Sequence, residues 1–373
     1  MKVNLVMIVK NEERSLEHSL SAAAPYVDDI IIADTGSTDR SRDIAAAFGA
    51  HVYDFAWCDD FSAARNFALE KSDEDHEADI NLSLDADEYL DIRENTDPDT
   101  FRHTLQHIVD RYGKRWIGQV HINNAFKEGN EINHNISIVP RILPSGIRYT
   151  GTIHEQIDSR ESRVMTPLFI AHDGYLYPEK SERNLNYLFT AIENEPESPF
   201  YLYQLASDLG RLRRFDESLG FFRTFYQKTS TAKTKKLTFW KDGILRYLYT
   251  LYDIGTDDAL EEAKDVMSKV QYDFSRNPDF FFYSGLFYSK LISTDNDNYN
   301  YLLPYVEKSY LKCLELGEKS REEGGIVGTG SFKAAYNLGY WYESSGDKEK
   351  AKEYYTLAAR DDYSFAVKRL NAI

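Results

Sequence analysis

Three carboxylates follow one apolar segment of the chain. Ile80, Leu82 and Leu84 mark this segment, and Asp85-Ala86-Asp87-Glu88 comes directly after it. Two Asp side chains separated by one small residue can share a hard divalent cation, which prefers oxygen ligands and keeps positions open for the oxygens of a diphosphate. A solvated acidic turn after a strand would give the same local pattern. The neighbouring elements must therefore show whether other functional groups lie beside these carboxylates.

The N-terminal half alternates between strand and helix patterns. Four mainly apolar segments predict strands, at residues 3–9, 30–33, 50–55 and 79–84, and helical patterns lie between them. Such alternation with short turns predicts an α/β fold with a doubly wound parallel sheet. Because ligands bind at the carboxyl ends of parallel strands, Asn11, Asp34, Arg65 and Asp87 should gather along one edge.

Four short segments carry a resemblance to a known family. They are Met7-Ile8-Val9-Lys10-Asn11-Glu12-Glu13, Asp34-Thr35-Gly36-Ser37-Thr38-Asp39, Phe61-Ser62-Ala63-Ala64-Arg65-Asn66 and Asp85-Ala86-Asp87-Glu88. In order and spacing they resemble the motifs of family-2 inverting glycosyltransferases with the GT-A fold, over roughly residues 1–180. The Q-x-x-R-W motif typical of processive polysaccharide synthases in that family is absent from the sequence. Processive polymerisation is therefore not expected.

The resemblance implies roles for individual residues. Asp34 would contact the nucleotide base, Asp85 the ribose or a metal-bound water, and Asp87 would hold Mg²⁺ or Mn²⁺ against the diphosphate of a UDP-sugar donor. Arg65 would bind the diphosphate, because a guanidinium can bind oxyanions bidentately. The other nucleotide contacts expected from the same motifs are Val9, Asn11, Glu12, Asn66 and Ala86.

Residues beyond these motifs are candidates for the catalytic base and a second metal ligand. An inverting transfer needs a carboxylate that takes the acceptor proton. Glu155, after Gly151 and His154, is the first candidate, and Asp173 is the second. In several GT-A enzymes a late His completes the metal site, which makes His172 a candidate ligand. The alternative for each is an ordinary structural role within the domain.

The pattern changes to paired helices after Pro178. We therefore expect a glycosyltransferase domain at residues 1–180 and an all-α repeat domain at residues 181–373. Residues 199–228 and 332–361 align as two copies of one unit with the spacing of a tetratricopeptide repeat, whose small residues let paired helices approach. The many Tyr and Phe residues here could stack on carbohydrate, but at helical spacing they favour a helix core. Such repeats favour binding of a peptide or protein.

Composition limits the location and the partners. The net charge of -17 argues against nucleic acid, because phosphate contacts need Lys and Arg. Cys58 and Cys313 do not suggest a disulfide framework. No signal peptide pattern and no apolar run of the ~20 residues needed to span a bilayer occurs, so we expect a cytoplasmic protein without an integral membrane segment.

Together these features predict an enzyme. We expect metal-dependent, inverting transfer of a hexose from a UDP-sugar to a Cys or Ser side chain of a peptide, since the layout resembles bacterial enzymes that glycosylate bacteriocin precursors. A lipopolysaccharide-core or other glycan acceptor is the alternative. A sugar nucleotidyltransferase would need a Gly-rich basic loop after the first strand, and Lys10-Asn11-Glu12-Glu13 is not such a loop. A non-catalytic scaffold would not need intact Asp34, Asp85 and Asp87, so their presence counts against that alternative. The sequence leaves the sugar and the oligomeric state open, with a homodimer among the options.

Overall fold

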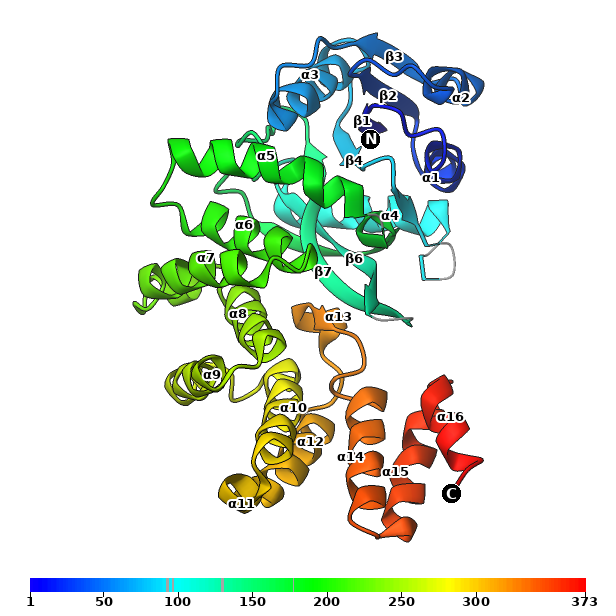
Figure 1. Ribbon diagram of the computed structural model, residues 1–373. Helices are drawn as coiled ribbons and strands as arrows, with labels where there is room; N and C mark the ends of the chain where they lie inside the picture. The colour runs from blue at the N-terminus through cyan, green and yellow to red at the C-terminus, as the bar shows by residue number, and fades with distance from the viewer. Residues whose placement is uncertain (92–93, 96, 129–130, 177) are drawn as a thin grey trace. The chain divides into compact units, whose positions relative to one another are not determined.

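The chain forms two compact units, residues 1–196 and 197–373, in this computed structural model (Figure 1). The structure describes all residues except 92, 93, 96, 129, 130 and 177. The boundary lies later than the expected residue 180, because helix α5 (Pro178–Asn194) packs on the N-terminal unit. The Tyr187 ring of α5 lies edge-on to Trp57 and Phe61, with centroids 6.2 and 5.5 Å away.

The N-terminal unit is built around one sheet. Its strands are β1 (Val3–Val9), β2 (Asp29–Asp34), β3 (His51–Asp54), β4 (Ile80–Ser83), β5 (Glu88–Leu90), β6 (Ile117–Glu128), β7 (Glu131–Pro144) and β8 (Arg163–His172). The order across the sheet is β3-β2-β1-β4-β7-β6-β8-β5. The expected parallel pairing holds for β3, β2, β1 and β4. The later strands make the sheet mixed: β7 runs antiparallel to β4 and β6, while β8 is parallel to β6 and antiparallel to β5.

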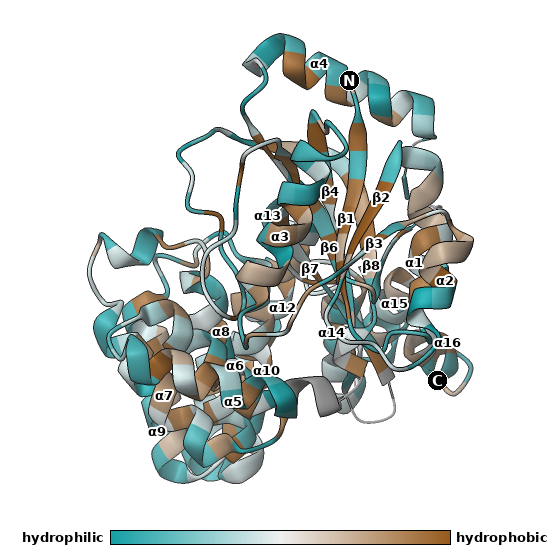
Figure 2. Ribbon diagram, turned by 90° about the horizontal axis from the view of Figure 1, so that it is seen from above, coloured by the Kyte–Doolittle hydropathy of each residue, from teal (hydrophilic) through white to brown (hydrophobic). Residues whose placement is uncertain are grey.

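Both faces of β1, β2 and β4 are buried, as their apolar sequences predicted, whereas β3 at the edge of the sheet is partly exposed. Leu5 and Met7 of β1 belong to one hydrophobic cluster, and Val6, between them, belongs to another. Successive side chains of a strand point to opposite faces, so β1 contributes to a core on each side of the sheet. Figure 2 shows the mainly hydrophobic colouring of this strand. A strand held on both faces is a rigid support for the polar residues at its end.

Helices connect and cover these strands. They are α1 (Leu16–Ala23), η1 (Ala24–Tyr26), α2 (Ser41–Ala47), α3 (Phe61–Glu74), α4 (Pro98–Tyr112), η2 (Gly174–Leu176) and α5. The start of α3 is fixed by Asp60, whose side chain accepts a hydrogen bond from the Ala63 N–H at 2.9 Å. Such an N-cap satisfies one of the free N–H groups of the first turn. It also sets the position of Arg65, one turn further along.

The C-terminal unit consists of paired helices and confirms the expected tetratricopeptide-like architecture. Its elements are α6 (Pro199–Arg211), α7 (Phe215–Lys228), η3 (Thr234–Lys236), α8 (Trp240–Ile254), α9 (Asp257–Val270), α10 (Pro278–Thr294), α11 (Asn296–Tyr299), η4 (Asn300–Leu302), α12 (Leu303–Leu316), α13 (Ser320–Glu323), β9 (Gly325–Ile326), α14 (Phe332–Ser344), α15 (Lys348–Ala359) and α16 (Ser364–Leu370). Glycines permit the close helix pairs. A Cβ added at Gly339 of α14 would lie 2.7 Å from the Tyr355 ring of α15, and one at Gly243 of α8 would lie 2.6 Å from Phe225 of α7. Many aromatic residues of this unit, such as Phe225 and Tyr355, are buried in its core.

Candidate active site

Two loops meet at the carboxyl ends of β1 and β2. The Asn11 side chain accepts a hydrogen bond from the Thr38 N–H at 2.8 Å, and the Asn11 N–H donates to the Ser37 hydroxyl at 3.0 Å. The Glu12 N–H donates to the Ser41 hydroxyl at 2.8 Å. Asn11 has a φ of 55°, a left-handed conformation that Asn tolerates better than most residues. These residues thus join the two loops that carry the first two motifs.

Asp34 ends β2 and is 2% exposed. Its Oδ2 accepts hydrogen bonds from the N–H groups of Gly36 and Ser37, at 3.2 and 3.1 Å, and from Arg42 Nη1 at 3.0 Å. Its Oδ1 is buried and accepts no hydrogen bond from any described residue. A buried acceptor without a donor costs about 1–3 kcal/mol. A donor N–H, such as that of a nucleotide base, would therefore be stabilised at Oδ1.

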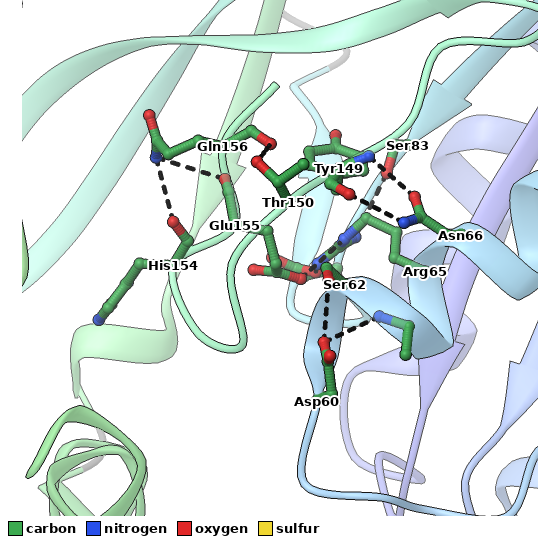
Figure 3. A network of polar contacts seen from close by, with 12 residues as sticks. Asp60, Ser62, Arg65, Asn66, Ser83, Tyr149, Thr150, His154, Glu155 and Gln156 are labelled. Atoms are coloured by element: carbon green, nitrogen blue, oxygen red, sulfur yellow. Dashed lines mark hydrogen bonds and ion pairs between the residues drawn. The ribbon is translucent and has the colours of Figure 1, made fainter. Parts of the chain in front are cut away.

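Arg65 lies between two carboxylates rather than at an open phosphate site. It is 3% exposed, and its Nη2 donates to Asp85 at 2.8 Å. Its Nε donates to Glu155 at 3.1 Å and its Nη1 to Ser83 at 3.3 Å (Figure 3). Each nitrogen of Arg65 thus donates to a side chain of the protein. Its observed role is to hold Asp85 and Glu155 in place.

Asn66, Val9 and Ala86 also make contacts within the protein. The Asn66 amide makes two hydrogen bonds with the backbone of Tyr149, each 2.8 Å long, which fix the segment leading to Glu155 (Figure 3). The side chains of Val9 and Ala86 are buried in the hydrophobic cluster that contains β1.

A second arginine, which the sequence did not identify, holds the Asp-x-Asp turn. Arg141 of β7 donates from Nη2 to Asp85 at 3.0 Å and to Glu88 at 2.5 Å. Burial alone would raise the pKa of Asp85, but Arg65 and Arg141 outweigh it and hold that pKa well below its usual range. The Asp85 side chain remains 36% exposed. Asp85 is therefore an ionised carboxylate that a ligand can reach.

Asp87 and His172 are brought together by β8. The Asp87 Oδ2 lies 3.5 Å from His172 Nε2, and His172 Nδ1 lies 2.8 Å from the Asn124 Oδ1. The Asn124 amide nitrogen lies near acceptors on Ile122, Asn135 and Ser137, so its oxygen must face His172. Nδ1 therefore carries a proton, and Nε2 is the imidazole atom directed at Asp87. Fixing one ring nitrogen in this way is characteristic of histidines that bind metals through the other.

The surroundings of Asp87 and His172 favour positive charge. Burial alone would lower the pKa of His172, but the hydrogen bond and attraction to Asp87 raise it. A cation bound between the two side chains would take the place of a proton on His172 Nε2. Four carboxylates at this edge outnumber two guanidinium groups; they are Asp85, Asp87, Glu88 and Glu155, with Arg65 and Arg141. Asp87 and His172 therefore offer one oxygen and one nitrogen ligand to a cation.

The two candidate bases occupy different environments. Glu155 accepts from Arg65 through Oε1 and has a side chain 12% exposed, whereas His154, with a φ of 51°, points away from Arg65 (Figure 3). Asp173 follows β8, and its buried Oδ1 has no hydrogen-bond partner within the described part of the chain. The neighbouring Gly174 is close to the metal candidates, since a Cβ there would contact both Asp87 and His172.

A family comparison agrees with the first half of this site. Residues 5–111 match Glycosyl transferase family 2. This region contains Asp34, Asp85 and Asp87, while Glu155 and His172 lie beyond it. The match supports glycosyl transfer as the activity of the N-terminal unit.

Other comparisons cover parts of the chain. A TPR repeat-containing protein of Synechococcus elongatus is 44% identical over 89 residues, which are 24% of this chain and 21% of that protein. The chain thus matches about a fifth of that relative's length. Two solved structures are 18% identical: MamA 41-end of Desulfovibrio magneticus RS-1 (49% of this chain, 86% of that chain, TM-score 0.37) and a thermophilic TPR protein of Thermus thermophilus (52%, 90%, TM-score 0.38). With such low TM-scores, neither likeness bears on function.

Proposed function

We propose that the chain is a metal-dependent inverting glycosyltransferase that moves a hexose from a UDP-sugar to a polypeptide acceptor. One observation carries this proposal: His172 Nε2 faces Asp87 with its tautomer fixed by Asn124, directly beside the ionised Asp85. Mg²⁺ or Mn²⁺ held by Asp87 and His172 would neutralise the diphosphate as it leaves. The family match of residues 5–111 supports the reaction class.

Asp34 and the joined loops would bind the nucleotide. The unpartnered Asp34 Oδ1 can accept a hydrogen bond from the N–H of a uracil base, and Arg42 holds the other oxygen in position. Asp85, held from two sides by Arg65 and Arg141, is placed to accept from a ribose hydroxyl or a metal-bound water. Because both arginines are already paired with carboxylates, they would position these groups without reorganising during the reaction.

The acceptor proton would pass to a carboxylate. Glu155 is our first candidate, since the Arg65 contact involves only Oε1 and leaves Oε2 to accept the proton. Asp173 is the second, because its Oδ1 has no hydrogen-bond donor among the residues described. In either case the acceptor atom would attack the anomeric carbon from the face opposite the nucleotide, so the configuration would invert.

The repeat unit supports a peptide or protein acceptor. Arrays of paired helices present extended concave surfaces, which are suited to polypeptides. We propose a Cys or Ser side chain of a precursor peptide as the acceptor atom, with a glycan acceptor as the competing outcome. No helix in the described parts of the chain is both long and apolar enough to cross a membrane.

The test is an assay of product release by the purified full-length chain. The chain is incubated with a panel of UDP-sugars and Mn²⁺. A glycosyltransferase releases UDP slowly when it transfers the sugar to water, and faster when a suitable acceptor is present. Release of pyrophosphate from UTP and a sugar phosphate would instead indicate a nucleotidyltransferase. Absence of turnover and of UDP binding with every donor would leave only a scaffold role. Peptides and glycans added in parallel would separate the two acceptor classes.

A further inference from the structure

A second group of metal-ligating side chains lies at the opposite edge of the parallel strands. Asp29 begins β2, His51 begins β3, and His76 follows α3. One ligand atom from each residue lies within 4.8 Å of the others. Asp29 Oδ1 is 3.9 Å from His51 Nε2, Asp29 Oδ2 is 3.6 Å from His76 Nδ1, and the two imidazole centroids are 4.1 Å apart.

We propose that Asp29, His51 and His76 bind a zinc-type transition-metal ion. Two imidazoles and one carboxylate form a donor set that suits Zn²⁺ and related dications better than Mg²⁺ or Ca²⁺. With bonds of about 2.0–2.1 Å, tetrahedral ligand atoms lie roughly 3.4 Å apart. The observed separations need only small side-chain shifts to reach this value. The fourth position would be left to water.

The surrounding residues support metal binding by His76. The Tyr53 hydroxyl lies 2.9 Å from His76 Nε2 and can accept a hydrogen bond from an N–H there, which leaves the lone pair of Nδ1 directed at Asp29 and His51. Metal-binding histidines usually donate their other ring N–H in this way. The His76 side chain is 13% exposed, so its ring is held largely by packing. His51 is 47% exposed and leaves the site open to solvent.

Lys2 is the competing cation at this cluster. Its ammonium group lies 2.8 Å from Asp29 Oδ2. A carboxylate has two oxygens, so Asp29 can bind a metal through one and retain Lys2 on the other. Lys2 is 37% exposed and carries a flexible stem, so it can also move aside. The amino group therefore tunes the affinity of the site without blocking it.

The position of the cluster indicates a structural role. Asp29 and Asp34 are at opposite ends of β2, about 16 Å apart at ~3.3 Å per residue. An ion at Asp29 would thus lie too far from the proposed transfer site to take part in its chemistry. It would instead join the starts of β2 and β3 to the chain after α3. This inference does not depend on the proposed function.

Metal titration of the full-length chain tests the proposal. Chelator-treated wild type, His51→Ala, His76→Ala and Tyr53→Phe are titrated with Zn²⁺ by calorimetry, and with Co²⁺ by visible absorption, in excess Mg²⁺. We expect the two histidine variants to lose one equivalent of tightly bound Zn²⁺, and Tyr53→Phe to bind it about 10–100-fold more weakly. Zn²⁺ bound at any other site would contribute equally to the titrations of the wild type and of these three variants. Zinc at about 100-fold its Kd should raise the wild-type unfolding midpoint by about 5–10 °C.

The matched control is His103→Ala with His107→Ala. These exposed residues lie four apart on α4, a spacing that can itself bind Zn²⁺. The control should keep the equivalent that His51→Ala loses. Unchanged zinc stoichiometry in His51→Ala and His76→Ala, or loss of that equivalent in the control alone, would overturn the proposal. Because His51 is exposed, its variant stays informative even if His76→Ala folds poorly.

Discussion

The two units place carboxylates against different partners. In the N-terminal unit, Asp85 and Glu155 contact the buried Arg65, while Asp34 and Asp173 each retain a buried oxygen without a donor from the described residues. In the C-terminal unit, carboxylates at helix contacts accept hydrogen bonds from tyrosine hydroxyls; the pairs are Tyr203–Asp242, Tyr247–Glu262, Tyr342–Glu307 and Tyr355–Glu343. The carboxylates of the proposed site thus contact an arginine or keep an oxygen without a donor, whereas these four carboxylates of the repeat unit connect helices through tyrosine hydroxyls.

This difference has a physical basis. A buried acceptor without a donor lowers stability, and it is kept only where something else compensates, such as a ligand. A carboxylate that accepts from a tyrosine hydroxyl instead stabilises a helix pair and has less capacity left for a ligand. Asp279 of the repeat unit, which is 4% exposed, likewise has a donor for each oxygen, because Thr329 donates to one and the Ile326 N–H to the other. The contrast predicts catalytic losses in one unit and stability losses in the other.

The largest effect should come from Asp87→Ala. Removing this carboxylate should abolish both UDP-sugar hydrolysis and transfer, a loss of at least about 10²-fold, because a bound cation contributes several kcal/mol at the transition state. Activity assays across Mn²⁺ concentrations, with circular dichroism to verify folding, measure this. Asp361→Ala, an exposed aspartate of the repeat unit, is the control. Near-normal turnover by chelator-treated Asp87→Ala would refute the metal assignment.

Removing the repeat unit should separate the two activities. A chain ending at Pro196 retains every proposed donor and metal residue, so it should still hydrolyse UDP-sugar slowly. It should lose transfer to a polypeptide, because the proposed acceptor surface is gone. Circular dichroism and UDP binding must first show that the shortened chain folds. Full-rate peptide transfer by a folded truncation would leave the repeats only a structural role.

Substitution of the proposed base should give a graded effect. Glu155→Gln keeps the shape of the side chain but removes proton acceptance, so kcat should fall by roughly 10²–10⁴-fold with little change in UDP-sugar affinity. Asp173→Asn is the comparison that identifies the base. In this variant the rate of transfer to a Cys acceptor should fall less than the rate of transfer to a Ser acceptor, because a thiol is partly ionised near neutral pH. An equal, small loss with both acceptors would point away from Glu155.

The smallest effect should come from Tyr355→Phe in the repeat unit. The Tyr355 ring is fully buried, and its hydroxyl donates to Glu343 at 2.6 Å. Removing the hydroxyl should lower the free energy of unfolding by about 1–3 kcal/mol, because a hydrogen bond to a carboxylate is lost. Glu343 would keep its contact with Arg369. Urea denaturation measures this, with the 85% exposed Tyr272→Phe as the control. UDP-sugar hydrolysis should not change, and a drop in it would contradict the division of roles.

The sequence by itself determined the local elements and the class of site. The apolar run of β1, the Asp-x-Asp after β4 and the small residues between paired helices are short-range patterns, and each is set by burial or by backbone geometry. Asp34, Asp85 and Asp87 could therefore be assigned to strand ends from these patterns alone. The expected boundary near residue 180 came from a change of pattern, which could not show that α5 packs on the N-terminal unit through Tyr187.

Only the tertiary structure decided which groups meet. Asn124 fixes the His172 tautomer across β6 and β8, and Arg141 reaches Asp85 from β7, contacts between residues 48 and 56 positions apart. Arg65 belongs to a recognisable motif, yet only the folded structure shows that its side chain lies against Ser83 at the end of β4, Asp85 and Glu155. Asp29, His51 and His76 show no spacing signal, because they converge only when β2, β3 and α3 pack. Long-range pairing depends on how the sheet assembles, which local patterns do not encode.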